Sequence, residues 1–251
     1  MTKPNLRTRT SKIMLVGYEY NSYKLGVALG VHWTPGPTAP PHWLVVGPSG
    51  TGKTVFSGQL AARMVLRENA RLWVANYKDD NFFQFLQGGQ GRYYRFRDAV
   101  NGIRDFYAVL EARLGGDTDR SLCLLWVDEL AAMVTGLDKK EGEFVKSAVA
   151  SILQTGRSLN CQLLVSVQRA DSAYFNNGAR ENFGNVVFLG PNITKEAAGM
   201  FGIDRAALPS VTGRAGYYIV NGNSEAIRPI QCPIIKDTAK LKEALSLGLT
   251  R

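Results

Sequence analysis

The sequence predicts an α/β fold with a mainly parallel central sheet flanked by helices, and a small β segment at its amino end. Three observations carry this prediction. Apolar runs of strand length, at 43–46, 121–127 and 162–167, are continuous, as expected of strands buried on both faces of a parallel sheet. Stretches with apolar residues at helical spacing separate these runs. A glycine-rich loop joins the first run to the helix that follows it.

Composition and length are those of a globular protein with an ample core. The 251 residues suffice for one large α/β domain, and 45% of them are hydrophobic. Lys and Arg number 30 against 21 Asp and Glu, so the net charge of +9 favours an anionic partner such as nucleic acid or a membrane surface. Three widely spaced cysteines indicate buried free thiols in a reducing compartment, and the presence of only two histidines argues against a zinc site.

The sequence also lacks the patterns that would place it in or across a membrane. No apolar run approaches the roughly 18 residues that a membrane-spanning helix needs. The polar amino end lacks the apolar core of a signal peptide. We therefore expect a cytoplasmic protein, with any attachment to a membrane made through a partner.

The first forty residues read as a basic tail followed by the small β segment. Residues 1–12 hold Lys3, Arg7, Arg9 and Lys12 and no acid, which fits a solvated tail or a nucleic-acid-binding arm. Short alternating segments at 12–33 suggest small strands. The proline-rich stretch 34–41 then leads into the first buried strand.

The chemistry of the chain is expected to centre on the loop after that strand, GPSGTGKT, which fits the phosphate-binding pattern G-x-x-x-x-G-K-[ST]. Its glycines let backbone N–H groups point inward, and the following helix adds the positive end of its dipole. Lys53 would reach the β- and γ-phosphates, and the Thr54 hydroxyl would ligate Mg²⁺. The predicted nucleotide-binding residues are Gly47, Pro48, Ser49, Gly50, Thr51, Gly52, Lys53 and Thr54.

A helix and a second strand, at 71–76, are expected next. The strand ends in the polar cluster 77–80, at the end of a strand where α/β sheets place ligand contacts. The segment RYYRFR at 92–97 interleaves aromatic and cationic residues. It suits an edge strand with a half-buried aromatic face, and a single-strand nucleic-acid platform is the alternative. An amphipathic helix over 98–114 follows.

The apolar run at 121–130 is the second chemical landmark, because it ends in Asp128 and Glu129. This looks like a Walker B segment, in which the aspartate holds the Mg²⁺ shell and the glutamate polarises the attacking water. The stretch 55–127 leaves room for an inserted strand pair and their helices. Together these features point to a RecA-like P-loop (ASCE) ATPase using ATP and Mg²⁺.

The remaining segments continue the alternation. We expect a charged loop at 135–143, a helix at 144–153 and a buried strand at 162–167 that closes on Gln168. A glutamine at this position can sense the γ-phosphate or orient water, and the alternative is that it is only a polar residue at the end of a strand. A polar loop at 171–182 contains Arg180. The last expected elements are a strand at 185–190, a helix at 193–200, strands at 215–220 and 227–235, and a terminal helix at 240–247.

With these segments placed, residues 24–235 resemble the FtsK/SpoIIIE branch of the HerA–FtsK ATPases, which are DNA-pumping motors. The markers in chain order are PH at 41–42, GPSGTGKT, YKD at 77–79, LEAR at 110–113, WVDEL at 126–130, LDKKEGE at 137–143, GR at 156–157, LLVSVQR at 163–169 and GRAG at 213–216. The family's Thr-Gln-Arg-Pro stands here as Val167-Gln168-Arg169-Ala170.

The resemblance implies a role for each matching residue. Asp128 is similar to the Mg²⁺-associated aspartate, Glu129 to the catalytic glutamate, and Gln168 to the sensor. Arg157 matches an arginine that reaches the neighbouring subunit's nucleotide in trans, with a surface salt bridge as the alternative. The loop that contains Lys139 and Lys140 resembles a channel loop that tracks the DNA backbone, and the loop at 171–182, with Arg180, resembles the second such loop. The alternative for these residues is a solvated charged loop without a role in DNA binding.

The function implied is an ATP-driven DNA translocase that serves conjugative DNA transfer, and we expect it to assemble as a homo-oligomeric ring of six subunits. A viral genome-packaging ATPase, a protein-secretion ATPase and a nucleotide-dependent adaptor are the alternatives. The predicted divisions are 1–40, a tail and β segment; 41–235, the motor domain; and 236–251, a terminal helix. With no membrane anchor or winged-helix domain expected, a relaxase, membrane channel or capsid component is the expected protein partner.

Overall fold

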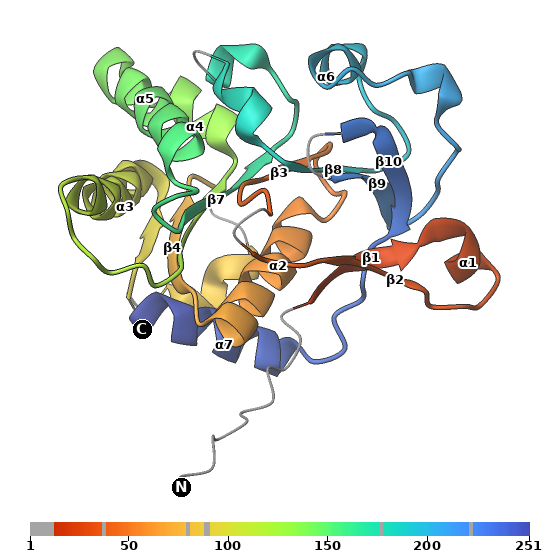
Figure 1. Ribbon diagram of the computed structural model, residues 1–251, viewed down its shortest axis with the longest axis horizontal. Helices are drawn as coiled ribbons and strands as arrows, with labels where there is room; N and C mark the ends of the chain where they lie inside the picture. The colour runs from red at the N-terminus through yellow and green to blue at the C-terminus, as the bar shows by residue number, and fades with distance from the viewer. Residues whose placement is uncertain (1–12, 37–38, 79–80, 88–90, 176–177, 221–222) are drawn as a thin grey trace, which may run out of the picture.

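The computed structural model describes residues 13–36, 39–78, 81–87, 91–175, 178–220 and 223–251. The described strands form one ten-stranded sheet in the order β2-β1-β10-β9-β8-β3-β7-β6-β4-β5 (Figure 1). The basic tail at 1–12 and residue 79 of the YKD marker lie outside the described residues.

One half of the sheet is parallel, as the continuous apolar runs predicted. Its central strand β3 pairs with β7 on one side and β8 on the other, and β6, β4 and β5 continue from β7. Thus β7 lies between the strand that precedes the glycine-rich loop and the strand that ends in Asp128. The six strands are β3 (Trp43–Val46), β4 (Arg71–Asn76), β5 (Tyr93–Arg95), β6 (Cys123–Asp128), β7 (Cys161–Val167) and β8 (Asn185–Leu189).

The other half is antiparallel, which the sequence did not predict. From β8 outward its strands are β9 (Ala215–Val220), β10 (Asn223–Gln231), β1 (Met14–Glu19) and β2 (Gly30–Trp33). Gly216 permits the close pairing of β9 with β8, because a Cβ there would overlap the Phe188 carbonyl. Because β1 pairs with β10, the amino-terminal strands β1 and β2 belong to the same sheet as β3, the strand that precedes the glycine-rich loop.

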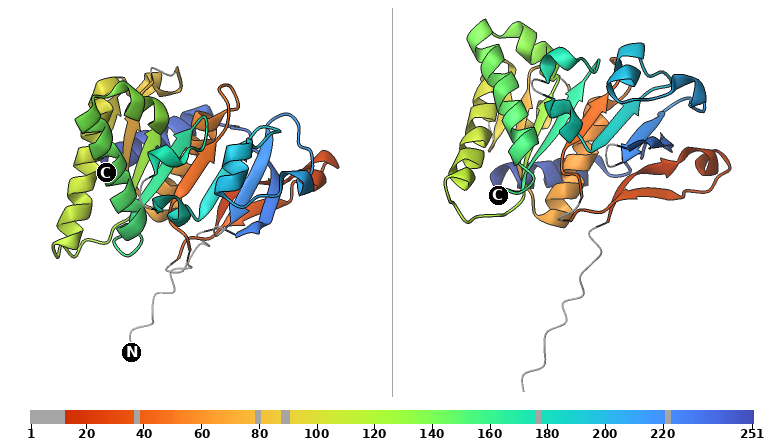
Figure 2. Two further views of the ribbon diagram at one scale, coloured as in Figure 1. Left: turned by 90° about the horizontal axis from the view of Figure 1, so that it is seen from above. Right: turned by 45° about the horizontal axis from the view of Figure 1, so that its top comes forward.

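Helices cover both faces of the parallel half (Figure 2). On one face α3 (Ala99–Leu114), α4 (Leu130–Gly136) and α5 (Lys139–Thr155) pack their apolar sides, joined by α6 (Lys195–Met200). On the other, α2 (Lys53–Glu68) packs on α7 (Thr238–Thr250). In the described part of the chain no helix combines the length and apolar character needed to span a bilayer.

One expectation about local structure was wrong, and one short helix was missed. The segment 135–143 is not a charged loop, because α5 begins at Lys139. Asp138 supplies the N-cap, and its Oδ1 accepts the Glu141 N–H at 2.9 Å. Aspartate followed three residues later by glutamate is a helix-start pattern, so the sequence did contain this signal. The short helix α1 (Tyr20–Lys24), capped by Glu19, was also missed.

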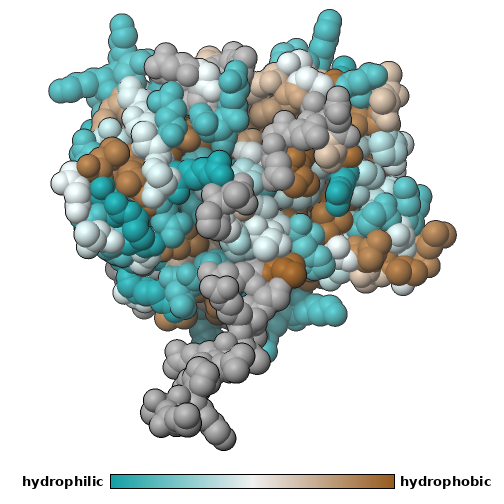
Figure 3. Space-filling view, in the orientation of Figure 1, coloured by the Kyte–Doolittle hydropathy of each residue, from teal (hydrophilic) through white to brown (hydrophobic). Residues whose placement is uncertain are grey.

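The hairpin of β1 and β2 carries exposed apolar side chains beyond α1. Leu25, Val27 and Leu29 are 83%, 58% and 57% exposed. Figure 3 shows apolar surface at the right edge of the molecule, where Figure 1 places α1 and the hairpin of β1 and β2. Neighbouring exposed apolar residues of this kind mark interaction surfaces more often than isolated ones do.

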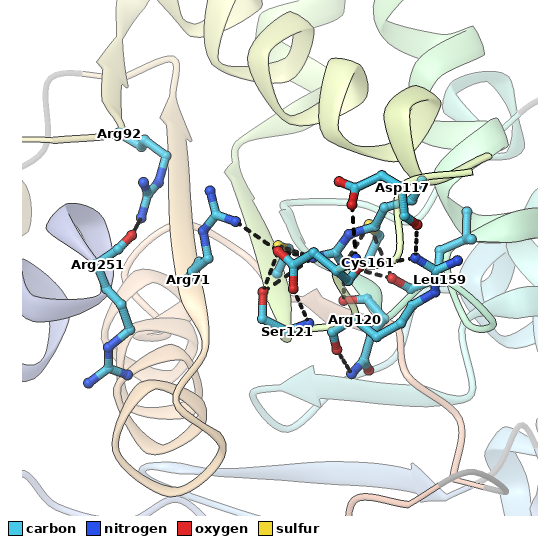
Figure 4. A network of polar contacts seen from close by, with 12 residues as sticks. Arg71, Arg92, Asp117, Arg120, Ser121, Leu159, Cys161 and Arg251 are labelled. Atoms are coloured by element: carbon cyan, nitrogen blue, oxygen red, sulfur yellow. Dashed lines mark hydrogen bonds and ion pairs between the residues drawn. The ribbon is translucent and has the colours of Figure 1, made fainter. Parts of the chain in front are cut away.

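At the amino ends of the parallel strands, a buried arginine organises a polar network (Figure 4). The Arg113 guanidinium, 2% exposed, donates to the Leu159 carbonyl at 2.7 Å and pairs with Asp119 at 3.2 Å. The thiols of Cys123 and Cys161 lie beside it, and burial raises the pKa of both, that of Cys161 to about 11. The two side chains are therefore protonated free thiols, in agreement with the sequence.

His42, just before β3, makes the stability of the fold depend on pH. Its Nδ1 accepts the Leu163 N–H at 3.1 Å, and burial lowers its pKa from 6.5 to about 3. Between these values the unfolded chain binds the proton and the folded chain does not. Stability should therefore fall by about 1.4 kcal/mol per pH unit as pH drops below 6.5.

Denaturant unfolding of the wild type and His42→Gln from pH 7 to pH 4 measures this contribution. Glutamine offers an oxygen to the Leu163 N–H and does not titrate, so the variant should lose the additional slope. Equal slopes in the two proteins would show that His42 does not govern the pH dependence.

Candidate functional site

The candidate site lies where three parallel strands end side by side. β3, β6 and β7 end at Val46, Asp128 and Val167, and each is followed by a segment that the sequence singled out. Because these strands run in the same direction and lie next to one another, their ends meet at one edge of the sheet. The glycine-rich loop, Glu129 and Gln168 are thereby brought together.

The glycine-rich loop has the backbone that its sequence requires. Gly50 and Gly52 take φ values of 83° and 88°, a left-handed conformation that favours glycine. Thr51 Oγ1 donates to the Pro48 carbonyl at 2.8 Å, closing the turn. Gly52 forms the N-cap of α2 without a side-chain capping bond, so the helix N-terminus stays open to an anion.

Thr54 and Asp128 together offer the oxygens of a magnesium site. The Thr54 hydroxyl, in the first turn of α2, donates to Asp128 Oδ2 at 3.1 Å. Asp128 ends β6 and is 1% exposed, so its position is fixed by the sheet. A hydroxyl and a carboxylate are the hard ligands that Mg²⁺ takes beside nucleotide phosphates, so the residues present fit that ion.

Glu129 is held in an unusual backbone conformation with cations around its carboxylate. Its φ and ψ are 60° and 49°, left-handed values that cost about 1 kcal/mol or more for a residue with a Cβ. Oε1 lies 3.5 Å from Lys53 Nζ, 3.1 Å from Lys78 Nζ and 3.5 Å from Gln168 Nε2. The side chains of Lys53 and Glu129 are 5% and 9% exposed, so this ion pair is largely shielded from solvent.

Two cavities flank the glycine-rich loop. One of about 280 Å³ lies between Val55 and Phe56 of α2 and the chain at Gly213, Arg214 and Cys232. Burial raises the pKa of the Cys232 thiol to about 12. The other, of about 230 Å³, lies on the side of Gln168 and α6. The first has the apolar lining that a nucleotide base takes.

Arg157 lies at the opposite end of the sheet from this site. It follows α5 and precedes β7, whereas Gln168 follows β7. The seven residues of β7 span about 20 Å, so Arg157 cannot reach the glycine-rich loop of its own chain. It is exposed and lines a cavity of about 320 Å³ with Trp33, Asn160 and Gln162.

The residues expected to contact DNA are not part of the loop site. Lys139 and Lys140 are exposed in the first turn of α5, and not in a channel loop as expected. Arg180 falls in the 3₁₀ turn Ala179–Asn182, and its side chain lies outside the described residues. Cations at a helix N-terminus oppose the helix dipole, so helix stability does not explain the two lysines.

Lys78 belongs to the site and was not among the predicted site residues. The sequence marked 77–80 only as a cluster in a place suited to ligand contacts. The pairing of β4 with β6, which sets Asn76 opposite Asp128, brings Lys78 beside Glu129. Knowledge of which strands are neighbours was needed to single it out.

Comparisons of sequence find no family model and no curated protein that matches. Comparison of structure finds the cytoplasmic domain of the Type VII secretion ATPase EccC of Thermomonospora curvata, with 16% identity and a TM-score of 0.65 over 99% of this chain and 32% of that one. It also finds EssC (ATPases 2 and 3) of Geobacillus thermodenitrificans, with 10% identity, a TM-score of 0.64, and 99% and 50% covered.

A third similar structure is the pCW3 conjugation coupling protein TcpA, a monomer form with ATPγS. It has 15% identity and a TM-score of 0.62, and the match covers 98% of this chain and 73% of that one. The chain thus spans about a third to a half of the EccC and EssC structures. The likeness concerns the fold: this chain has the fold of P-loop ATPase domains.

Proposed function

We propose that this chain binds ATP together with Mg²⁺, hydrolyses the γ-phosphate bond, and uses the cycle to move DNA. The observation that carries the proposal is the convergence of Lys53, Thr54, Asp128, Glu129 and Gln168 at one edge of the sheet. A phosphate loop, an Mg²⁺ ligand pair and a carboxylate beside them are the parts that nucleotide hydrolysis needs.

Hydrolysis at this site would proceed by in-line attack of water on the γ-phosphorus. Glu129 accepts a proton from the water as the new P–O bond forms and the bond to the bridging oxygen breaks, leaving ADP and phosphate. Lys53 offsets charge on the phosphates, and Gln168 holds the water or a γ-phosphate oxygen. Bound Mg²⁺ would neutralise further charge on the phosphates.

Self-association would complete the site. Arg157 lies too far from its own phosphate loop, so it can stabilise the transferring phosphoryl group only in a neighbouring copy. The exposed apolar residues Leu25, Val27 and Leu29 also suit burial between copies. We propose a ring, with six subunits as the working number, in the cytoplasm.

DNA is the proposed substrate of the motor. The net charge is +9, and two exposed lysines begin α5 where the helix itself gains nothing from them. Contacts of lysine with phosphates are independent of base sequence, as a translocase requires. The likeness to a conjugation coupling protein supports DNA transfer, and the likeness to Type VII secretion ATPases supports the movement of polypeptide as the second candidate.

ATP hydrolysis measured with and without linear double-stranded and single-stranded DNA, at 50 mM and 200 mM salt, tests the choice. We expect a severalfold stimulation by DNA that is lost at the higher salt, since each phosphate contact releases counterions. The variant with Lys139→Gln and Lys140→Gln should need more DNA for half-maximal stimulation and show a weaker salt dependence. The matched control Lys240→Gln, an exposed lysine of α7, should behave as wild type.

Stimulation by a basic or unfolded polypeptide and none by DNA would favour the secretion reading. An oligomeric protein that hydrolyses ATP at one rate whatever is added would instead support a nucleotide-dependent adaptor. A protein that neither binds nor hydrolyses ATP would contradict the proposal altogether.

A further inference from the structure

Three hydrogen-bond donors converge on one oxygen atom at the centre of the site. Lys53 Nζ, Lys78 Nζ and Gln168 Nε2 lie 3.5, 3.1 and 3.5 Å from the same atom, Glu129 Oε1. Two of these donors are ammonium groups. The position that Oε1 occupies is therefore an anion position, and a carboxylate oxygen of the protein fills it.

Lys78 reaches this position from a fixed backbone. Its N–H donates to Asn76 Oδ1 at 3.1 Å, which closes a turn directly after β4. Tyr77 packs on the ring of Phe96, with centroids 5.4 Å apart, and the Tyr77 side chain fills the space that Gly136 leaves open. Neighbours on both sides thus hold the residue before Lys78 between α4 and the 3₁₀ turn Phe96–Asp98 that follows β5.

The two lysines approach the anion position from different surroundings. The side chain of Lys53 is 5% exposed and that of Lys78 is 42% exposed. Lys53 lies at the start of α2, and its Nζ also donates to the Pro48 carbonyl at 3.3 Å, within the phosphate loop. A phosphate bound on the loop would therefore contact Lys53 on its buried side and Lys78 on its solvent-exposed side.

We propose that Lys78 is a second phosphate-binding lysine, which exchanges its ion pair with Glu129 for the γ-phosphate of bound nucleotide. The terminal phosphate carries more charge and more acceptor oxygens than a carboxylate, so it displaces Glu129 from the position between the lysines. While Glu129 Oε1 contacts both ammonium groups, that oxygen is not open to an attacking water. The exchange therefore releases Glu129 only when a γ-phosphate is present. This inference rests on the proposed function.

The consequence is selectivity for nucleotides that carry a γ-phosphate. Isothermal titration of the full chain with ATPγS and with ADP, in Mg²⁺, measures it for the wild type, Lys78→Met and Lys78→Arg. Lys78→Met should lose about tenfold in affinity for ATPγS, the size of one charge-assisted hydrogen bond, and bind ADP within twofold of wild type. Lys78→Arg should keep most of the affinity for ATPγS.

The matched control is Lys240→Met, which removes another ion-paired lysine far along the chain. It should leave both affinities unchanged. If Lys78→Met keeps the wild-type preference for ATPγS over ADP, or loses both ligands equally, the proposal is wrong. Wild-type protein that binds neither nucleotide would instead contradict the proposed function, so the two failures are distinguishable.

Removing Glu129 tests the exchange itself. Glu129→Gln should bind ATPγS severalfold more tightly than wild type, because no charged carboxylate competes for the lysines. The gain should shrink when Lys78→Met is also present, since one of the contested partners is gone. An equal gain in both backgrounds would show that Lys78 and Glu129 do not exchange with the phosphate.

Discussion

Glu129→Gln is expected to lower the rate of ATP hydrolysis by about 100-fold to 10,000-fold while nucleotide stays bound, the range that a positioned general base contributes. Glutamine has nearly the shape of glutamate and can still meet Lys53 and Gln168, but it cannot take the proton of the attacking water. Steady-state phosphate release and titration with ATPγS separate the loss of turnover from any loss of binding.

The control for this variant is Glu143→Gln, which removes an exposed carboxylate of α5 that pairs with Lys146. It should hydrolyse ATP at the wild-type rate. A fall of less than threefold in Glu129→Gln would show that another group accepts the proton. The same variant separates a motor from an adaptor in the cell, because an adaptor that needs only bound ATP should keep its function.

The parts of the site that could be predicted are those in which a motif and a strand end are adjacent in sequence. The strand 43–46 and the loop after it were placed correctly, as was the strand that ends at Asp128. Continuous apolar runs identify buried parallel strands, and the direction of such strands fixes the edge at which their following residues meet. The grouping of Glu129 with Gln168 follows from the same rule.

The features that the sequence did not predict depend on which strands pair with one another or on how a helix is capped. Lys78 meets Glu129 only because β4 lies next to β6, and the order of strands is not a local property. The amino-terminal strands join the antiparallel half because β10 pairs with β1, strands that lie far apart in sequence. The charged residues around Lys139 are typical of a loop, and in the sequence they mask the weaker helix-start signal of the Asp138 cap.

Arg157→Ala is expected to reduce turnover in the assembled protein by about 1,000-fold or more, the effect typical of an arginine supplied to a phosphoryl-transfer site. Binding of ATPγS should change little, because the residue lies a strand length away from its own phosphate loop. Sedimentation must show the same oligomer as wild type. Arg120→Ala, which removes an exposed arginine near the same end of the sheet, is the control and should remain active.

Mixing two inactive variants decides whether Arg157 acts between subunits. In a mixed assembly, an Arg157→Ala subunit contributes an intact Glu129, and a Glu129→Gln subunit contributes an intact Arg157. At an interface where the nucleotide of the Arg157→Ala subunit faces the Glu129→Gln subunit, every proposed catalytic group is present. Hydrolysis should therefore reappear when the two variants are assembled together. Mixtures as inactive as the separate variants, in assemblies shown to contain both, would remove Arg157 from the proposed mechanism, because an arginine acting in trans must complement across that interface.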